Sequence, residues 1–133
     1  MILVDTSVIV AWLDRDHPQH QECARGLAYW AGQDRLAISA VSYAELAAGG
    51  RTQEAMDEDL SPFQRIDLDF KGAWRAGHAF GRSPSGKDQN KSVLPDYLIR
   101  GQAASLDCRH LTIDKRRLTA FPDVEFLFPA DTP

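Results

Sequence analysis

The sequence predicts an α/β fold in which about five parallel strands form a central sheet covered by helices on both faces. Short apolar runs recur along the chain, and helical patterns lie between them. This alternation favours right-handed crossovers and therefore a parallel sheet. The first run, residues 2–4, is apolar and partly β-branched, which is typical of strands buried on both faces. Ligands of such sheets bind at the carboxyl ends of the strands.

Each element follows from composition or from helix start and stop signals. The predicted strands are residues 2–4, 36–39, 65–68, 108–112 and 124–128. The predicted helices are residues 8–13, 19–31, 42–48, 52–60, 70–80 and 95–105. Pro95 starts the last helix, and Gly49 and Gly50 end the third. The polar stretch 81–92, rich in Gly, Ser and Lys, is predicted to be a mobile loop.

Length and composition favour one globular domain spanning residues 1–133. The chain is 44% hydrophobic, enough for a core of ordinary size. It has neither an apolar stretch of roughly 20 residues nor the features of a signal peptide, so we expect a cytoplasmic protein without membrane association. Its two cysteines, Cys23 and Cys108, are too few for a disulfide framework or a four-ligand zinc site.

Four acidic residues are the candidates for chemistry. Asp5 follows the first strand, Asp114 follows the fourth strand, and the other two lie on helices, Glu45 after the second strand and Asp96 in a first turn. Singly, each has an ordinary explanation as a helix cap, a turn residue or an exposed helix position. Together they could converge at one edge of the sheet, and Glu45 has more apolar neighbours than an exposed position usually has.

Converged carboxylates predict a bound cation. Two carboxylates about 4 Å apart repel by roughly 4 kcal/mol at an effective dielectric near 20, so a cluster needs protons or a cation. An all-oxygen ligand set suits Mg²⁺ or Mn²⁺ better than zinc. Such an ion can polarise a phosphate, activate a water and offset charge during hydrolysis. Since no set of Ser, Cys and His suggests a covalent enzyme, hydrolysis by metal-activated water is the simpler prediction.

Four short motifs carry a resemblance to a known family. They are residues 2–7 (ILVDTS), 42–46 (SYAEL), 95–99 (PDYLI) and 111–118 (LTIDKRRL). In this order, and with a short distance between the third and fourth acids, they resemble the motifs of PIN-domain nucleases and most of all those of VapC-type toxins. The similarity runs from the first predicted strand to the last.

The resemblance implies a three-layer α/β/α sandwich, endoribonuclease activity that depends on Mg²⁺ or Mn²⁺, homodimerisation, and inhibition by a small antitoxin protein. It also implies that the catalytic metal site consists of Asp5, Glu45, Asp96 and Asp114. The Ser7 and Thr112 hydroxyls would orient carboxylates or metal-bound water. Two stretches depart from the family pattern, namely the long polar approach 81–94 and residues 100–102, and both imply a difference in substrate or antitoxin choice.

Basic residues are candidates for RNA contact. Residues 82–117 hold eight basic and four acidic side chains, although the whole chain has a formal charge of −4. Phosphate binding requires such basic segments, but ordinary solvated surface charge explains them equally well. The candidate contacts are Arg82, Lys87, Lys91 and Arg100. By contrast, Trp12, Trp30 and Trp74 lie on apolar helix stripes, which favours core or dimer packing over base stacking.

Two other functions remain open. A receiver-like signalling domain also binds Mg²⁺ at an acidic sheet edge, and Asp67 or Asp69 could then accept a phosphoryl group. That reading leaves Glu45 unexplained, and it requires adjacent acids after the first strand, where only Asp5 is present. A catalytically silent relative that acts as a binding module is the second alternative.

Overall fold

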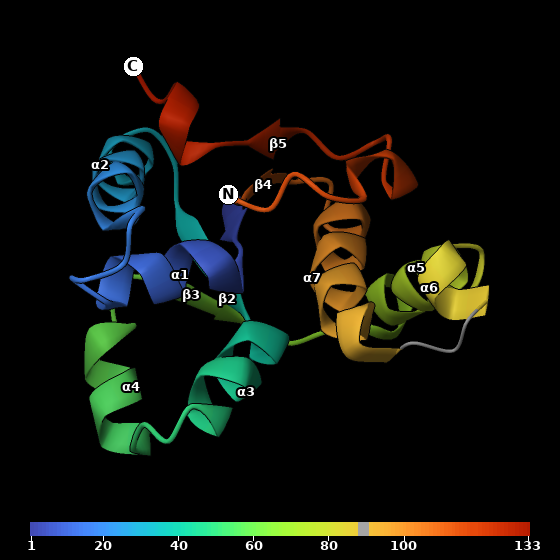
Figure 1. Ribbon diagram of the computed structural model, residues 1–133, viewed down its shortest axis with the longest axis horizontal. Helices are drawn as coiled ribbons and strands as arrows, with labels where there is room; N and C mark the ends of the chain where they lie inside the picture. The colour runs from blue at the N-terminus through green and yellow to red at the C-terminus, as the bar shows by residue number, and fades with distance from the viewer. Residues whose placement is uncertain (88–90) are drawn as a thin grey trace.

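Five parallel strands form one sheet in the order β3-β2-β1-β4-β5, which places β1 at the centre (Figure 1). The computed structural model describes residues 1–87 and 91–133. The strands are β1 (Ile2–Val4), β2 (Leu36–Ser39), β3 (Gln64–Ile66), β4 (Arg109–Leu111) and β5 (Phe126–Leu127). The predicted parallel sheet is confirmed.

Every predicted helix and strand is present, and its ends agree with the prediction to within two residues. The α-helices are α1 (Thr6–Leu13), α2 (His20–Ala31), α3 (Ala40–Ala48), α4 (Gln53–Asp59), α5 (Phe70–Gly81), α6 (Pro84–Lys87) and α7 (Leu94–Ser105). Three 3₁₀ helices follow, η1 (Lys91–Val93), η2 (Leu118–Ala120) and η3 (Pro129–Asp131). Helix α3 begins earlier than predicted because Ser39 caps it, its hydroxyl accepting a hydrogen bond from the Val41 N–H at 3.1 Å.

Helices cover both faces of the sheet, which gives the three-layer α/β/α arrangement. Alternate residues of β1 point to opposite layers, Ile2 and Val4 to one core and Leu3 to the other. The first core contains residues of α1, α2, α3 and α4, and the second contains residues of α5 and α7. Figure 1 shows these two groups of helices on either side of the strands.

Helices α5 and α7 approach each other closely at glycines. A Cβ atom on Gly101 would lie 2.7 Å from the Ala76 Cβ and from the Gly72 carbonyl oxygen. Only a residue without a side chain fits there. The departure from the family pattern at residues 100–102 therefore has a packing role, because Gly101 allows this close contact.

The prediction of a continuous loop over residues 81–92 is wrong in part. Helix α6 occupies Pro84–Lys87, and η1 begins at Lys91. Ser83 starts α6, since its hydroxyl accepts a hydrogen bond from the Gly86 N–H at 3.1 Å and Pro84 suits a first helical position. Residues 88–90 lie outside the described residues, so the prediction of mobility is untested there.

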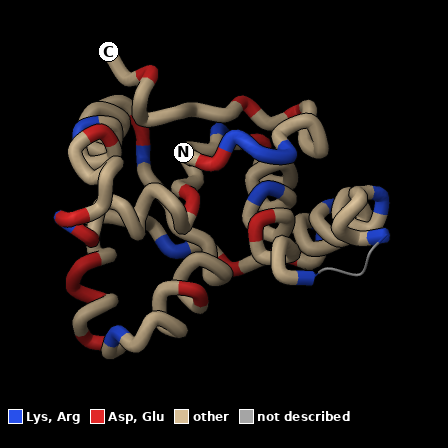
Figure 2. The backbone as a smooth tube through the Cα atoms, in the orientation of Figure 1, with Lys and Arg blue, Asp and Glu red and all other residues tan. Residues whose placement is uncertain are grey.

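Charge divides across the molecule as it does along the chain. Figure 2 shows acidic residues concentrated on α4, and basic residues around α5, α6 and the segment that precedes η2. The basic segment therefore lies mainly on the α5 and α7 side of the sheet. Within the described ranges, no helix combines the length and the apolar composition that crossing a membrane requires.

Candidate metal centre and active site

Asp5 is a buried carboxylate at the carboxyl end of the central strand. It is the N-cap residue of α1, yet its side chain makes no capping hydrogen bond. Instead Oδ2 accepts hydrogen bonds from the Ser7 and Thr112 hydroxyls, and His110 Nε2 lies 3.6 Å from Oδ1. Burial raises the pKa of Asp5, but its contacts with His110, Ser7 and Thr112 lower it well below its usual range. Asp5 is therefore held as an anion.

Glu45 lies half-buried on α3 and is tied to the DTS motif. The Thr6 hydroxyl lies 2.8 Å from Glu45 Oε1 and 2.7 Å from the Ser42 hydroxyl. Burial raises the pKa of Glu45, the bond to Thr6 lowers it, and the negative charges of Asp96 and Asp5 raise it further. The net shift is upward, so the surroundings oppose the charged form of Glu45.

Asp96 lies half-buried in the first turn of α7. Burial raises its pKa most, and the negative charges of Asp5 and Asp114 add to this effect. The positive charges of Arg100 and Arg117 offset only part of the shift. Asp96 is therefore a carboxylate whose ionised form lacks sufficient stabilisation from the protein itself.

Asp114 is stabilised by an adjacent arginine. Arg116 makes two hydrogen bonds of 3.0 Å to the Asp114 carboxylate, one from Nε and one from Nη2. Thr112 also connects this residue to Asp5, because its hydroxyl accepts a 3.0 Å bond from the Asp114 N–H. Burial raises the pKa of Asp114, but the hydrogen bonds and charge of Arg116 lower it overall.

Arg100 does not have the position expected of an RNA contact. Its side chain is only 2% exposed. Its guanidinium donates hydrogen bonds to the backbone carbonyls of Arg116 at 2.6 Å and Asp114 at 3.1 Å. The expectation of phosphate contact is therefore wrong for Arg100, which holds the loop that carries Asp114. Arg82, Lys87 and Lys91 are exposed, as contact with RNA would require.

The four carboxylates influence one another's ionisation without forming a closed ligand shell. Asp96 interacts with the charges of Asp5 and Asp114, and Glu45 interacts with those of Asp96 and Asp5. Within residues 1–87 and 91–133, however, no group of three or more His, Cys, Asp or Glu residues is arranged to hold a metal ion. Two sets of hydrogen bonds link their surroundings: Thr6 beside Asp5 bonds Glu45, and Thr112 connects Asp5 with Asp114.

This donor set fits Mg²⁺ or Mn²⁺. All of its donors are carboxylate oxygens, which hard divalent cations prefer. Mg²⁺ usually keeps several waters and binds through one or two carboxylates together with substrate phosphates, so it does not need a closed protein shell. The pKa values of Glu45 and Asp96 are raised first by burial and then by neighbouring negative charges, and a divalent cation would favour the charged forms of both.

The receiver-like alternative does not fit this topology. Receiver-like sheets have the strand order 2-1-3-4-5, which places the third strand beside the first. Here β3 is an edge strand and β2 separates it from β1. Asp69 caps α5, its carboxylate accepting a 3.0 Å hydrogen bond from the Gly72 N–H. The two acids after β3 therefore lack the central position of a phosphate acceptor.

The sequence prediction missed several polar residues around the acids. Thr6 lies inside the DTS motif, and Ser42 precedes Glu45 by one helical turn, so motif and spacing could have identified both. His110 is a third such residue: it is fully buried beside Asp5, and neither ring nitrogen has a hydrogen-bond partner among the described residues. Its place in an apolar strand was the available signal.

Comparisons with known proteins extend over nearly the whole chain. A family model described as PIN domain matches residues 2–127. The protein named Ribonuclease VapC10 from Mycobacterium tuberculosis is 36% identical over 132 residues, a match that covers 97% of this chain and 92% of that protein.

Solved structures of similar fold belong to two-component complexes. One is VapBC-1 from nontypeable Haemophilus influenzae, with a TM-score of 0.72, 20% identity and coverage of 98% of this chain and 99% of that chain. Another is FitAcB from Neisseria gonorrhoeae, with a TM-score of 0.71, 21% identity and the same coverage. VapBC2 from Rickettsia felis, bound to a promoter DNA fragment, has a TM-score of 0.69, 21% identity and coverage of 96% and 98%. These structures confirm the fold.

Proposed function

Because the chain belongs to the PIN domain family, we propose that it is a divalent-metal-dependent endoribonuclease that hydrolyses RNA phosphodiester bonds. The observation that carries this proposal is the PIN domain match over residues 2–127, which includes the motifs of Asp5, Glu45, Asp96 and Asp114. Hydrogen bonds from Thr6 to Glu45 and through Thr112 between Asp5 and Asp114 support a shared site at the end of β1. The relative that is 36% identical over most of both chains is named a ribonuclease, which supports the same activity.

The four acids would hold Mg²⁺ or Mn²⁺ directly or through water. The bound ion would supply charge stabilisation at the phosphate and a more acidic water. Asp5 is suited to anchor the site, because Ser7 and Thr112 fix its carboxylate while His110 lies close to its other oxygen. The hydroxyls of Ser7 and Thr112 would therefore act by orienting Asp5.

Asp96 is the better candidate for the general base. A base works best when its pKa lies near the working pH, and the pKa of Asp96 is raised from its ordinary value. Asp114 is a weaker candidate, since Arg116 occupies both of its oxygens and lowers its pKa. Asp96 would accept a proton from the attacking water, while Asp114 would remain a charged partner at the edge of the site.

We also propose that the protein is the toxin of a toxin–antitoxin pair, binds a small antitoxin protein and forms a homodimer. The similar solved structures include VapBC and FitAcB complexes, and one of them is described as a toxin–antitoxin complex from Klebsiella pneumoniae. Copurification with the product of an adjacent short reading frame, and loss of nuclease activity in that complex, would test this role.

The nuclease itself is tested with end-labelled structured RNA. Cleavage is expected with Mg²⁺ or Mn²⁺ and is expected to stop in EDTA. The Asp5→Asn and Asp96→Asn variants should lose it, while the exposed Asp16→Asn variant serves as the matched control. If the folded wild type cleaves no RNA with either metal, the protein is a silent binding module.

A further inference from the structure

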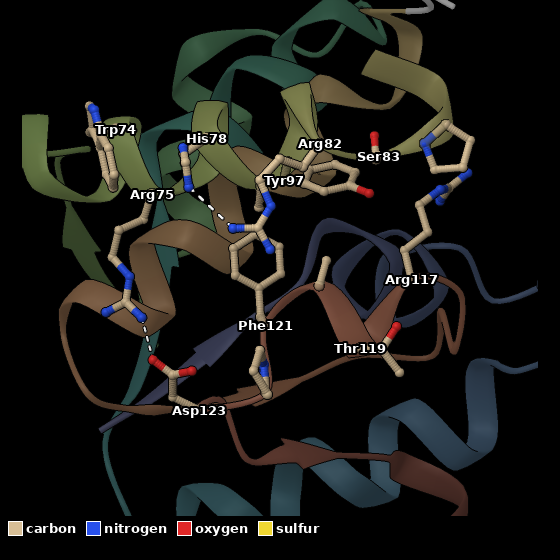
Figure 3. Close-up of a pocket in the computed structure, with 14 residues that line it drawn as sticks. Trp74, Arg75, His78, Arg82, Ser83, Tyr97, Arg117, Thr119, Phe121 and Asp123 are labelled. Atoms are coloured by element: carbon tan, nitrogen blue, oxygen red, sulfur yellow. Dashed lines mark hydrogen bonds and ion pairs between the residues drawn. The ribbon is translucent and has the colours of Figure 1, made fainter. Parts of the chain in front are cut away.

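A cavity of about 490 Å³ lies between α5 and the segment from Arg117 to Asp123 (Figure 3). None of the four acids lines it. Tyr97 and Phe121 meet inside the cavity with ring centroids 5.7 Å apart, and both are nearly completely buried. The cavity therefore combines a firm aromatic floor with an opening at the surface of α5.

An aromatic pair stands at one side of this cavity. The rings of Trp74 and His78 are stacked, with centroids 4.6 Å apart and planes that differ by 10° (Figure 3). The expectation for Trp74 was core or dimer packing; Trp74 is 66% exposed, so it does not lie in the core, and dimer packing is untested. An exposed indole supported by a stacked neighbour resembles the aromatic platforms on which nucleic-acid bases stack.

The cavity wall is also basic. Its aspartate, Asp123, is paired with Arg75, which leaves Arg82 and Arg117 as further positive charges at the cavity. Arg82 Nη1 lies 3.2 Å from His78 Nε2, so this arginine stands next to the aromatic pair. Arg117 has a buried Nη1 without a hydrogen-bond partner among the described residues. An anion is the natural partner for this wall.

Two residues of the cavity belong to the segments that carry the acids. Tyr97 lines the cavity and directly follows Asp96 in the first turns of α7. Arg117 lines it as well and belongs to the loop that carries Asp114, and its positive charge acts on Asp96. The cavity and two of the acids, Asp96 and Asp114, are therefore carried by the same two segments, α7 and the loop after β4.

We propose that this cavity is a nucleotide-binding subsite, in which one base of single-stranded RNA stacks on Trp74 while its phosphate contacts Arg82 and Arg117. The identity of the ligand as RNA rests on the proposed function. Single-stranded RNA fits the site because its unpaired bases can leave the stack and lie against an aromatic side chain. The stacked ring pair favours a planar base over an acidic peptide.

The test measures the binding of a fluorescein-labelled single-stranded RNA oligonucleotide in EDTA, where cleavage does not interfere. Trp74→Ala should weaken binding roughly tenfold, the size expected for one lost stacking contact. Arg82→Ala should also weaken binding. The slope of log affinity against log salt concentration should fall by about one unit, as expected for one lost phosphate contact. Phe70→Ala and Lys71→Ala should bind as the wild type does, because both residues are exposed on α5 and neither lines the cavity.

Several results would overturn the subsite. If folded Trp74→Ala binds RNA as tightly as Phe70→Ala, no base stacks there. If both variants instead dissociate a dimer and leave RNA binding unchanged, this face of α5 is an interface between two copies of the chain. If a labelled acidic peptide binds more tightly than RNA, and only Trp74→Ala weakens it, the cavity receives a protein partner.

The subsite and the nuclease can fail separately. Loss of RNA affinity in Trp74→Ala, combined with no cleavage by the wild type, would support the subsite and reject the enzyme. Cleavage by the wild type with unchanged RNA affinity in Trp74→Ala would support the enzyme and reject the subsite. For an active wild type, Trp74→Ala should raise KM for the oligonucleotide more than it lowers kcat, because Trp74 lies outside the acid site.

Discussion

Asp5 and Asp96 belong to the same group of acids, but the protein stabilises their charges in opposite ways. Asp5 is almost fully buried, yet two hydroxyls and a histidine surround it, and its pKa is lowered. Asp96 is only half-buried, and its pKa is raised by burial and by the charges of Asp5 and Asp114. The fold thus stabilises the charge of Asp5, whereas it disfavours the charge of Asp96, which a bound cation would stabilise under the proposed function.

The largest expected effect comes from Asp5→Asn, which removes the carboxylate that the Ser7 and Thr112 hydroxyls hold in place. An amide carries no charge to pair with a cation and presents N–H groups where Ser7 or Thr112 now donates. We expect metal-dependent RNA cleavage to fall at least about 100-fold. The melting temperature should fall as well, because the lowered pKa of Asp5 means that its charge stabilises the folded state.

Asp16→Asn is the control for this exchange in both cleavage assays and thermal melts. Asp16 is exposed and follows the C-terminus of α1, whereas Asp5 precedes the N-terminus of that helix. An Asp5→Asn protein that melts and cleaves like Asp16→Asn would show that the fixed carboxylate is not the anchor of the site.

Thr112→Val tests how Asp5 and Asp114 are connected. Valine has nearly the shape of threonine but leaves the Asp114 N–H and Asp5 Oδ2 each without one partner. Because Thr112 is fully buried, we expect a loss of about 1–3 kcal/mol in the free energy of unfolding. Cleavage should fall about tenfold, as for other residues that orient metal ligands. Ser7→Ala should have the smaller effect in denaturant titrations. Ser7 is less buried than Thr112, and its exchange removes the hydrogen bond to Asp5, whereas Thr112→Val removes two.

Asp96→Asn should have the opposite effect on stability. In EDTA the variant should melt a few degrees above the wild type, at about 3 °C for each kcal/mol, because the exchange removes a repelled charge. With Mg²⁺ the wild type should gain more stability than the variant, since it retains the ligand. A lower melting temperature for Asp96→Asn in EDTA would show that the charge of Asp96, like that of Asp5, stabilises the folded protein.

The pH dependence of this difference has a defined sign. The pKa of Asp96 in the folded state is raised above its ordinary value of 3.8, so the folded protein binds more protons than the unfolded chain just above that pH. The wild type therefore loses stability as pH rises from about 3.8 to the raised pKa. The extra stability of Asp96→Asn over the wild type should be absent well below this pH range and constant above it. Thermal melts at a series of pH values would measure this difference.

The places of the four acids in the fold were predictable from the sequence because topology determines where strand ends meet. Asp5 and Asp114 follow β1 and β4, which are neighbours in the sheet, and the motif order indicated Glu45 and Asp96. Element boundaries were predictable for a similar reason, since caps such as Ser39 act locally. Structural features that depend on residues adjacent in the chain, or on the order of the strands, can therefore be predicted from the sequence.

The environment of each side chain was not predictable in the same way. Arg100 seemed suited to the surface by charge, but the loop of Asp114 folds over it and supplies carbonyl acceptors from residues far along the chain. Trp74 had the spacing of a core residue, yet its side chain is exposed on α5. Helix α6 was missed because the polar composition of its segment outweighed the Ser83-Pro84 start signal.

The smallest expected effect comes from Arg116→Ala, which changes how Asp114 is stabilised. Arg116 is 70% exposed, so its ion pair with Asp114 should contribute under about 1 kcal/mol to folding. Without Arg116, however, both oxygens of Asp114 become free to interact with a cation. We therefore expect Mg²⁺ to bind roughly threefold more tightly, measured by titration of Mn²⁺ or Mg²⁺ in calorimetry.

Lys115→Ala is the matched control for Arg116→Ala, because it removes the same charge from the adjacent exposed position and leaves the bonds to Asp114 intact. A gain in metal affinity that is equal in both variants would reflect only the net charge of the loop. A gain confined to Arg116→Ala would show that Asp114 is a ligand whose charge an arginine stabilises until a metal ion replaces it. Asp114 would then be intermediate in character between Asp5, whose charge the fold stabilises, and Asp96, whose charge the fold disfavours.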